Sequence, residues 1–162
     1  MKNLITSLLA IVLIVLYKVM SNNSQEQRIF NTLIASKISV GLALLIVAQS
    51  KHETAVAGVP FSSRQCLLNN NFFGYGYVVK NSFQVPGGGG KHKEDSGIYA
   101  KYDSLENSVK DVAGWYNRRS AAFSHVVTPA DLAAALKQQK YFTDLEKNYL
   151  AGLTKFYTKN LS

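Results

Sequence analysis

The chain of 162 residues carries 18 Lys and Arg against 10 Asp and Glu, a formal charge of +8 at pH 7, and 47% of its residues are hydrophobic. This composition excludes a disordered chain and is sufficient for one domain with a packed core and a short appendage. The positive charge favours polyanionic surroundings such as nucleic acid, acidic lipid or cell-wall polymers. Because the Lys and Arg residues are dispersed, we expect no nucleic acid as a partner.

The first 20 residues place Lys2 ahead of an apolar run from Leu4 to Tyr17. This run is shorter than the ~20 residues of a comfortable membrane span, and no A-x-A-like cleavage site follows it. We expect residues 1–20 to be an uncleaved membrane anchor, with a cleaved signal segment or a buried helix as alternatives. Residues 21–26 are then a linker and residues 27–162 a single domain, which faces the periplasm or cell wall, or is exported.

Two helices are predicted at the start of the domain. Apolar residues at helical spacing indicate a first helix from about Gln25 to Ser36. Ser39 can cap a second helix that is apolar on almost every face from Val40 to Val47, which is typical of a central core helix. This helix ends near Glu53. Burial and the negative end of the helix dipole would raise the pKa of that carboxyl, as a general acid requires, whereas a solvated carboxylate is the alternative.

The pattern changes to strand-forming residues between Gly74 and Ala100. Tyrosines and valines favour strands there, and Pro86 followed by four glycines interrupts them, which predicts a small β-hairpin. Further helices are predicted from three starting signals: Asp103 with Glu106, Thr128 with Pro129, and Thr143 with Glu146. The expected fold class is mainly α with a small β-hairpin lobe, a lysozyme-like α+β architecture.

Cys66 is the single cysteine, so the chain can form no intrachain disulfide, and its apolar neighbours favour a small buried residue over a catalytic thiol. The three histidines lie apart in the sequence, and no Cys/His pair has the spacing of a zinc site. We therefore expect no metal ion and no other cofactor.

Four motifs follow one another along residues 27–153. They are AQ with ET at residues 48–54, NNFFG at 70–74, YDSLENSVKD at 102–111, and KYFTD at 140–144 with Tyr149 beyond. In this order they resemble the A-Q-x-x-x-E-[S/T], N-N-x-F-G, aromatic-x-S-x-x-E-S-[I/V]-x-D and G-Y-A-T-D-x-x-Y elements of the N-acetylglucosaminidases of glycoside hydrolase family 73, which cleave peptidoglycan. The sequence TAVAG at residues 54–58 departs from the family's usual S-G-W-G-x-S, and the gap from Glu53 to Asn70 is longer than usual.

The resemblance implies that Glu53 is the general acid that protonates the glycosidic oxygen. A second carboxylate, where the family uses one, would lie on the predicted hairpin, so Glu94 and then Asp95 are the candidates, with a solvated loop as the alternative. A substrate whose own N-acetyl group acts as the nucleophile would need neither. Among the aromatic residues, Tyr141 is expected to be the best stacking platform for a sugar ring, and Trp115 is assigned to the core. The residues expected to bind substrate are three amides and three aromatic rings: Gln49, Asn70, Asn71, Phe73, Tyr75 and Tyr141.

The predicted function is a peptidoglycan hydrolase that cleaves the β-1,4 glycosidic bond after N-acetylglucosamine. A lytic transglycosylase on the same scaffold is one alternative. A non-catalytic cell-wall-binding component of a virion or secretion apparatus is another. The expected partners are peptidoglycan glycan strands and, through residues 1–20, a membrane; the location would be virion-associated if a phage encodes the protein.

Overall fold

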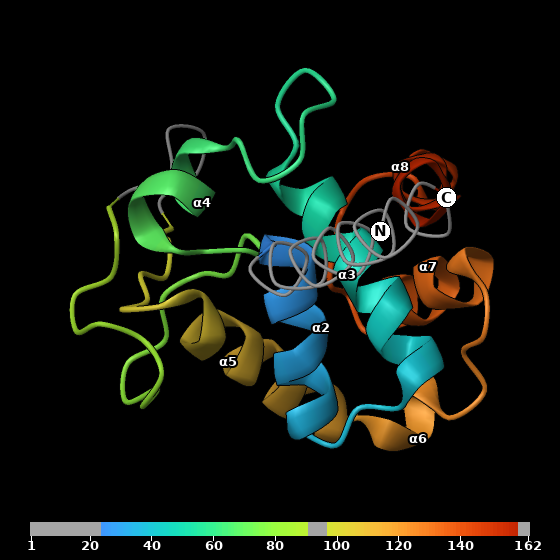
Figure 1. Cartoon of the computed structure of the whole chain (residues 1–162), viewed down its shortest axis with the longest axis horizontal. Helices are drawn as coiled ribbons and strands as arrows, with labels where there is room; N and C mark the ends of the chain where they lie inside the picture. Colours follow the sequence, from blue (N-terminus) through green and yellow to red (C-terminus); the bar gives the residue numbers. More distant parts are fainter. Residues whose placement is uncertain (1–23, 91–96, 159–162) are drawn as a thin grey trace, which may run out of the picture.

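The computed structural model describes residues 24–90 and 97–158, and seven α-helices lie within these two ranges. The helices are α2 (Gln25–Ala35), α3 (Val40–Thr54), α4 (Arg64–Asn69), α5 (Leu105–Asn117), α6 (Ser120–Phe123), α7 (Pro129–Gln138) and α8 (Glu146–Thr158). In Figure 1 most of them gather into a bundle, whereas α4 and the long connection between α4 and α5 lie to one side. Across the two described ranges, no helix is long and apolar enough to cross a membrane.

Three sequence predictions fall on residues outside these ranges. The predicted membrane anchor at residues 1–20 is one, and the candidate carboxylates Glu94 and Asp95 are the others. Gln25 and Glu26, assigned from the sequence to the linker, are the first two residues of α2.

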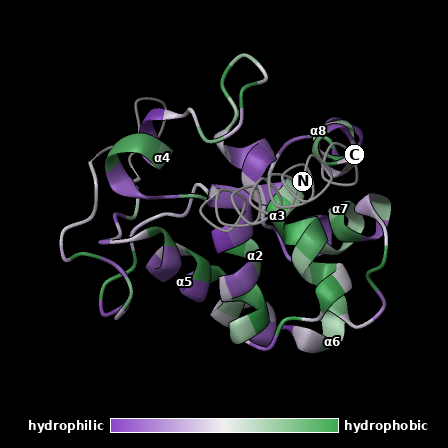
Figure 2. Ribbon diagram, viewed as in Figure 1, coloured by the Kyte–Doolittle hydropathy of each residue, from purple (hydrophilic) through white to green (hydrophobic). Residues whose placement is uncertain are grey.

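Helix α3 is the central helix of the bundle, as its apolar sequence predicts. Residues 45–51 are all buried, and α3 packs against both α2 and α8. Figure 2 shows α3 as hydrophobic along much of its length and hydrophilic towards its C-terminal end. Helix α2 also packs on α5, and α7 packs on α8. Because α3 has apolar neighbours on several sides, its C-terminal residues are held in a fixed place relative to α8.

The helix starts agree with the sequence at α7 and differ at α5 and α8. Thr128 caps α7 as predicted, and Asp131 completes a capping box with it. The predicted box of Asp103 with Glu106 is wrong, because Ser104 is the residue directly before α5 and accepts the hydrogen bond of the Asn107 amide at 3.2 Å. At α8, the Asp144 carboxylate, rather than Thr143, accepts the backbone amide of Leu145 at 2.6 Å.

The predicted β-hairpin is not formed by the described residues of this segment, 74–90 and 97–100. Among the described residues, the connection between α4 and α5 contains no strand, and Gly76 and Tyr99 form an isolated antiparallel bridge. Two features prevent a ladder from forming. The backbone turns through positive φ angles at Lys80, Gly87 and Gly88, and Val78 and Val79 are both exposed, so the alternation of buried and exposed residues that a strand requires is broken there. The mainly α class is confirmed.

Side-chain hydrogen bonds, rather than a β-ladder, order this connection. We name residues 74–90 and 97–104 the loop lobe. One carboxylate oxygen of the buried Asp111 on α5 accepts hydrogen bonds from Tyr102 at 2.9 Å, Gln84 at 3.0 Å and Asn81 at 2.9 Å. Gly88 lies against the chain at Tyr99, where a Cβ atom would approach the carbonyl oxygen to 2.6 Å. The loop lobe is therefore ordered by contacts between residues distant in sequence.

Candidate active site

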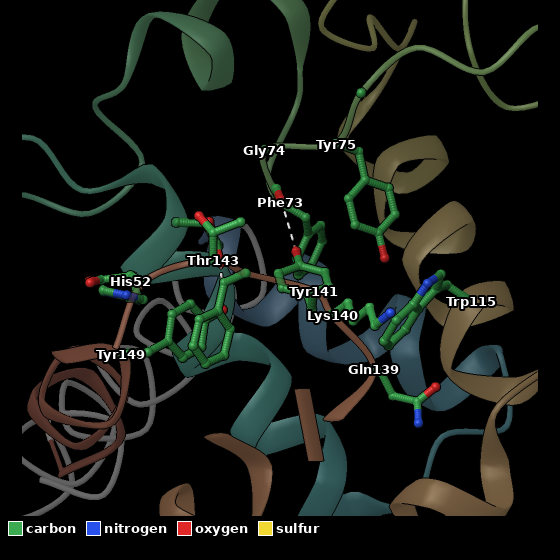
Figure 3. A pocket seen from close by; sticks show the side chains of 14 residues that line it. His52, Phe73, Gly74, Tyr75, Trp115, Gln139, Lys140, Tyr141, Thr143 and Tyr149 are labelled. Atoms are coloured by element: carbon green, nitrogen blue, oxygen red, sulfur yellow. Dashed lines mark hydrogen bonds between the residues drawn. The ribbon is translucent and has the colours of Figure 1, made fainter. Parts of the chain in front are cut away.

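A cleft of about 610 Å³ lies where the end of α3, the start of the loop lobe, α5, the α7–α8 connection and α8 meet. Figure 3 shows His52 and Tyr149 towards one end of this cleft and Tyr75 and Trp115 towards the other, with Tyr141 between them. The cleft is lined by His52, Glu53, Phe73, Gly74, Tyr75, Gly76, Trp115, Gln139, Lys140, Tyr141, Phe142, Thr143, Asp144 and Tyr149. Three of the residues predicted to bind substrate, Phe73, Tyr75 and Tyr141, thus share one cavity with the predicted general acid.

The Glu53 carboxyl sits at the C-terminal end of α3 and faces α8. The Tyr149 hydroxyl donates a hydrogen bond to Glu53 Oε1 at 2.5 Å. Burial raises the pKa of Glu53 from 4.5 to about 7, and the hydrogen bond from Tyr149 opposes this rise because it stabilises the carboxylate form. A carboxyl with a pKa of about 7 keeps a substantial protonated fraction at neutral pH, so it can donate a proton there.

Rings on both sides hold Tyr149 in place. Its ring stacks on Phe142 with centroids 3.9 Å apart and an interplanar angle of 4°, and it meets the edge of His52 at 4.7 Å. Gly152 makes room for the imidazole, because a Cβ atom there would lie 2.2 Å from His52. Burial lowers the pKa of His52 and the nearby Asp144 partly opposes this, so at neutral pH His52 is mainly an uncharged packing partner of Tyr149.

Aromatic side chains form one wall of the cleft. Tyr141 donates a hydrogen bond to the backbone oxygen of Phe73 at 2.9 Å, marked by a dashed line in Figure 3. The Tyr141 ring lies 5.9 Å from Tyr75 and 5.6 Å from Trp115. The Arg119 guanidinium covers the Trp115 ring at 4.4 Å. Trp115, which the sequence assigned to the core, is partly buried against the core and also lines the cleft.

The three amides predicted to bind sugar do not line the cleft. Gln49 and Asn71 are buried, with 0% and 1% of their surface exposed, so neither offers its polar group to a substrate in this structure. Asn71 instead fixes the backbone that leads to the cleft. Its Nδ2 donates to the carbonyl oxygens of Tyr75 and Ala100, and its Oδ1 accepts the backbone amide of Tyr75. Asn70 has a positive φ of 47° at the end of α4 and donates to the Tyr102 carbonyl at 3.0 Å.

Phe73 lines the cleft but is 2% exposed, so it contributes to the floor of the cavity rather than to an open stacking face. The Tyr75 hydroxyl is also buried, and no described residue accepts or donates a hydrogen bond to it. Tyr141 and Trp115 are less buried than Phe73, and they remain the aromatic residues of the wall that a sugar ring could contact.

Asp144 is a second carboxylate in the lining of the cleft. Its Oδ1 accepts the Leu145 amide at 2.6 Å and the Asn148 side chain at 3.1 Å, which places it at the start of α8 in a structural role. Within the described ranges, no group of three His, Cys, Asp or Glu side chains could hold a metal ion. Cys66 is buried, as predicted.

The sequence analysis did not place His52, Trp115, Phe142 and Asp144 in the cleft, and it assigned no contact to Tyr149. Local signals existed for three of them, because His52 precedes Glu53 and because Phe142 and Asp144 lie in the KYFTD motif with Tyr141. Trp115 and Phe142 have the apolar spacing of ordinary core residues, so the sequence pattern does not separate a core ring from a cleft ring.

A mainly α domain with a protonatable carboxyl in an aromatic-walled cleft is the arrangement of a glycosidase that uses acid catalysis. The chain belongs to the Glucosaminidase family, described as mannosyl-glycoprotein endo-β-N-acetylglucosaminidase: the family model matches residues 33–162. It is therefore a glycosidase, and the resemblance to glycoside hydrolase family 73 is confirmed. Comparisons with curated proteins and with solved structures found no significant match.

Proposed function

We propose that the protein hydrolyses peptidoglycan at the β-1,4 glycosidic bond after N-acetylglucosamine, with Glu53 as the general acid. The observation that supports this most strongly is the Glu53 carboxyl itself, which lines the cleft and has a pKa raised to about 7 by burial. In this role the protonated carboxyl gives its proton to the glycosidic oxygen as the leaving sugar departs. Membership of the glucosaminidase family supports a glycan substrate of this kind.

The walls of the cleft suit a strand of amino sugars. Tyr141 and Trp115 offer ring faces and edges to pyranose rings, and the Tyr141 ring is anchored by its bond to Phe73. Lys140 lines the cleft and Arg119 lies over Trp115, so the end of the cleft near Trp115 is cationic. Cations there would attract the carboxylates of the peptidoglycan stem peptides, in keeping with the formal charge of +8.

Hydrolysis also needs a second group, which acts as the nucleophile or directs water on the far side of the glycosidic bond. Of the two carboxylates in the described cleft lining, Asp144 is engaged at the start of α8 and Glu53 is the proton donor. The substrate's own acetamide could act as the nucleophile, or Glu94 or Asp95 could direct water. Because Asp144 is engaged, Glu53 is the one available carboxylate in the described cleft lining. This observation also favours the second candidate, a lytic transglycosylase, in which Glu53 alone would serve first as acid and then as base.

Mass spectrometry of the soluble products from digested peptidoglycan tests this proposal. We expect fragments with reducing N-acetylglucosamine ends from the wild type and none from Glu53→Gln. Glu106→Gln is a matched control, since Glu106 pairs with Arg28 on the surface of α5 and α2, and it should retain full activity. Anhydromuramic products would establish the transglycosylase instead. Binding to the wall without cleavage by the wild type would establish the non-catalytic alternative.

We also propose that the enzyme acts at the cell wall, either anchored through residues 1–20 or exported. A periplasmic reporter fused to residues 1–26 tests this: an active reporter in the membrane fraction indicates an anchor, and an active reporter in the soluble fraction indicates a cleaved signal. An inactive reporter would contradict both.

A further inference from the structure

Gln49 is a fully buried amide with only part of its hydrogen bonding satisfied. It lies on α3 one turn before Glu53 and has 0% of its surface exposed. Its Oε1 accepts a hydrogen bond from the Tyr116 hydroxyl at 2.7 Å. Its Nε2 is buried as well, and none of the described residues accepts a hydrogen bond from it in good geometry. Unpaired buried amide groups are costly and uncommon, so this side chain calls for a specific explanation.

Tyr116 determines which way the Gln49 amide faces. The Tyr116 side chain is 1% exposed, and its hydroxyl donates to Gln49. A hydroxyl proton can be given to the amide oxygen but not to the amide nitrogen, so this bond fixes Oε1 towards Tyr116 and directs Nε2 away from it.

Gln49 and Glu53 lie one turn apart on the same face of α3, and the Tyr149 hydroxyl meets this face at Glu53. Burial raises the pKa of Tyr149 well above its ordinary value, the charge of Glu53 raises it further, and the Gln49 side chain lowers it. An amide N–H lowers a phenol pKa when it faces the phenol oxygen, because it stabilises the phenolate form. The lowering of the Tyr149 pKa by Gln49 fits an amide nitrogen that faces the phenol oxygen, although no hydrogen bond joins Gln49 Nε2 to a described residue.

In that arrangement the Tyr149 oxygen would lie between the Gln49 amide and the Glu53 carboxyl. Stacking on Phe142 and the edge contact with His52 fix the plane of the ring. A phenolic hydrogen prefers to lie in the ring plane, which leaves it two directions. An amide N–H near the oxygen disfavours the direction that points at the amide, so the hydrogen turns to Glu53 Oε1, 2.5 Å away.

We propose that Gln49 is a positioning residue, whose amide, oriented by Tyr116, holds the Tyr149 hydroxyl in the direction that donates to Glu53. The three side chains form a buried relay, Tyr116–Gln49–Tyr149, that ends on the carboxyl. Gln49 acts through Tyr149 and does not touch the substrate, which replaces the sugar-binding role predicted from the sequence. The effect on catalysis rests on the proposed function, whereas the effect on the titration of Glu53 does not.

Titration of the Glu53 carboxyl by ¹³C NMR tests the relay without any substrate. The variants are Gln49→Met, which keeps the length of the side chain but cannot donate, Tyr149→Phe, and the double variant. Removing a donor from the carboxylate disfavours its charged form, so both single variants should raise the Glu53 pKa above the wild-type value of about 7. Because Gln49 acts only through Tyr149, the double variant should show no larger rise than Tyr149→Phe alone.

Kinetics on solubilised peptidoglycan supply the second readout. Gln49→Met should lower kcat by about tenfold, the typical order for one hydrogen bond at a charged group, and leave KM unchanged. Tyr116→Phe is a second route to the same result, since it keeps the core volume and releases the amide to turn; it should raise the Glu53 pKa in the same direction. This variant decides the question if Gln49→Met does not fold.

Tyr102→Phe is the matched control. It also removes a buried tyrosine hydroxyl, but one that donates to Asp111 in the loop lobe, so the Glu53 titration should not change. An unchanged titration in both Gln49→Met and Tyr116→Phe would overturn the relay, and so would effects of Gln49→Met and Tyr149→Phe that add. A raised KM in Gln49→Met with an unchanged Glu53 titration would indicate instead that Gln49 contacts the sugar directly. A wild type that does not cleave peptidoglycan would contradict the proposed function, while the NMR titration would still decide on the relay.

Discussion

In the folded protein the Glu53 carboxyl has a pKa of about 7, compared with 4.5 for an unperturbed side chain. At pH values between these two pKa values, the Glu53 carboxyl is therefore protonated in the folded state and ionised in the unfolded state. The contribution of Glu53 to the free energy of unfolding is complete below pH 4.5 and is lost as the pH rises through about 7, which amounts to about 3 kcal/mol. Glu53 thus makes the protein less stable at the pH where the carboxyl is useful as an acid.

Glu53→Gln should remove this pH dependence, because a neutral amide does not titrate. We expect the variant to match the wild type in stability at pH 4 and to be more stable at pH 8. Urea denaturation followed by circular dichroism at the two pH values measures the difference. Equal stability of the two proteins at pH 8 would show that burial does not raise the Glu53 pKa.

Asn71 is predicted to support the fold rather than to bind sugar. Its side chain makes three hydrogen bonds to the backbone of Tyr75 and Ala100 and is 1% exposed. Asn71→Ala should lower the free energy of unfolding by about 2–3 kcal/mol, on the basis of about 1 kcal/mol for each bond. The exposed Asn31→Ala is the control and should change stability little. Full stability with a raised KM in Asn71→Ala would return this residue to the substrate-binding site.

At the scale of the elements, the N-terminal caps differ in what they contribute. Thr128 forms a capping box at α7, whereas Ser39 at the start of α3 makes no capping bond with its side chain to the described residues. Thr128→Ala should therefore cost about 1 kcal/mol of stability, and Ser39→Ala much less. Thermal unfolding of the two variants measures this, and equal losses would contradict the assigned caps.

The helices were predictable because their signals are local. The almost uniformly apolar sequence of α3 indicates a central helix, and Thr128 with Pro129 marks the start of α7. The loop lobe was not predictable in the same way. Its tyrosines and valines favour strands, but its order comes from Asp111, which is 27 and 30 residues away from Gln84 and Asn81. Such pairings leave no periodic pattern in the sequence.

At the scale of the whole molecule, the cleft depends on the attachment of the loop lobe to the helical bundle. Asp111 joins the two, since one carboxylate oxygen on α5 accepts three side chains of the lobe. Asp111→Ala leaves these donors without their acceptor and should cost about 3 kcal/mol or more. We expect faster proteolysis within the loop lobe than in the wild type. The exposed Asp103→Ala is the control, and equal cleavage rates in the two variants would show that Asp111 is not the attachment.

The position of Glu53 in the cleft followed from its motif, but its surroundings required the fold. Tyr149 lies 96 residues from Glu53 in the sequence and contacts it because α8 packs on α3. Gln49 precedes Glu53 by one turn, and sequence alone did not show that its amide is buried. A motif identifies which residues occur together, whereas access to solvent depends on what packs over them.

The pH dependence of the rate of peptidoglycan cleavage tests the central claim most directly, namely that Glu53 is the proton donor. If the protonated carboxyl is the acid, kcat/KM should fall as the pH rises through about 7, and this limb should coincide with the NMR titration of Glu53. A rate that stays level or increases through this range, or cleavage that persists in Glu53→Gln, would contradict the account.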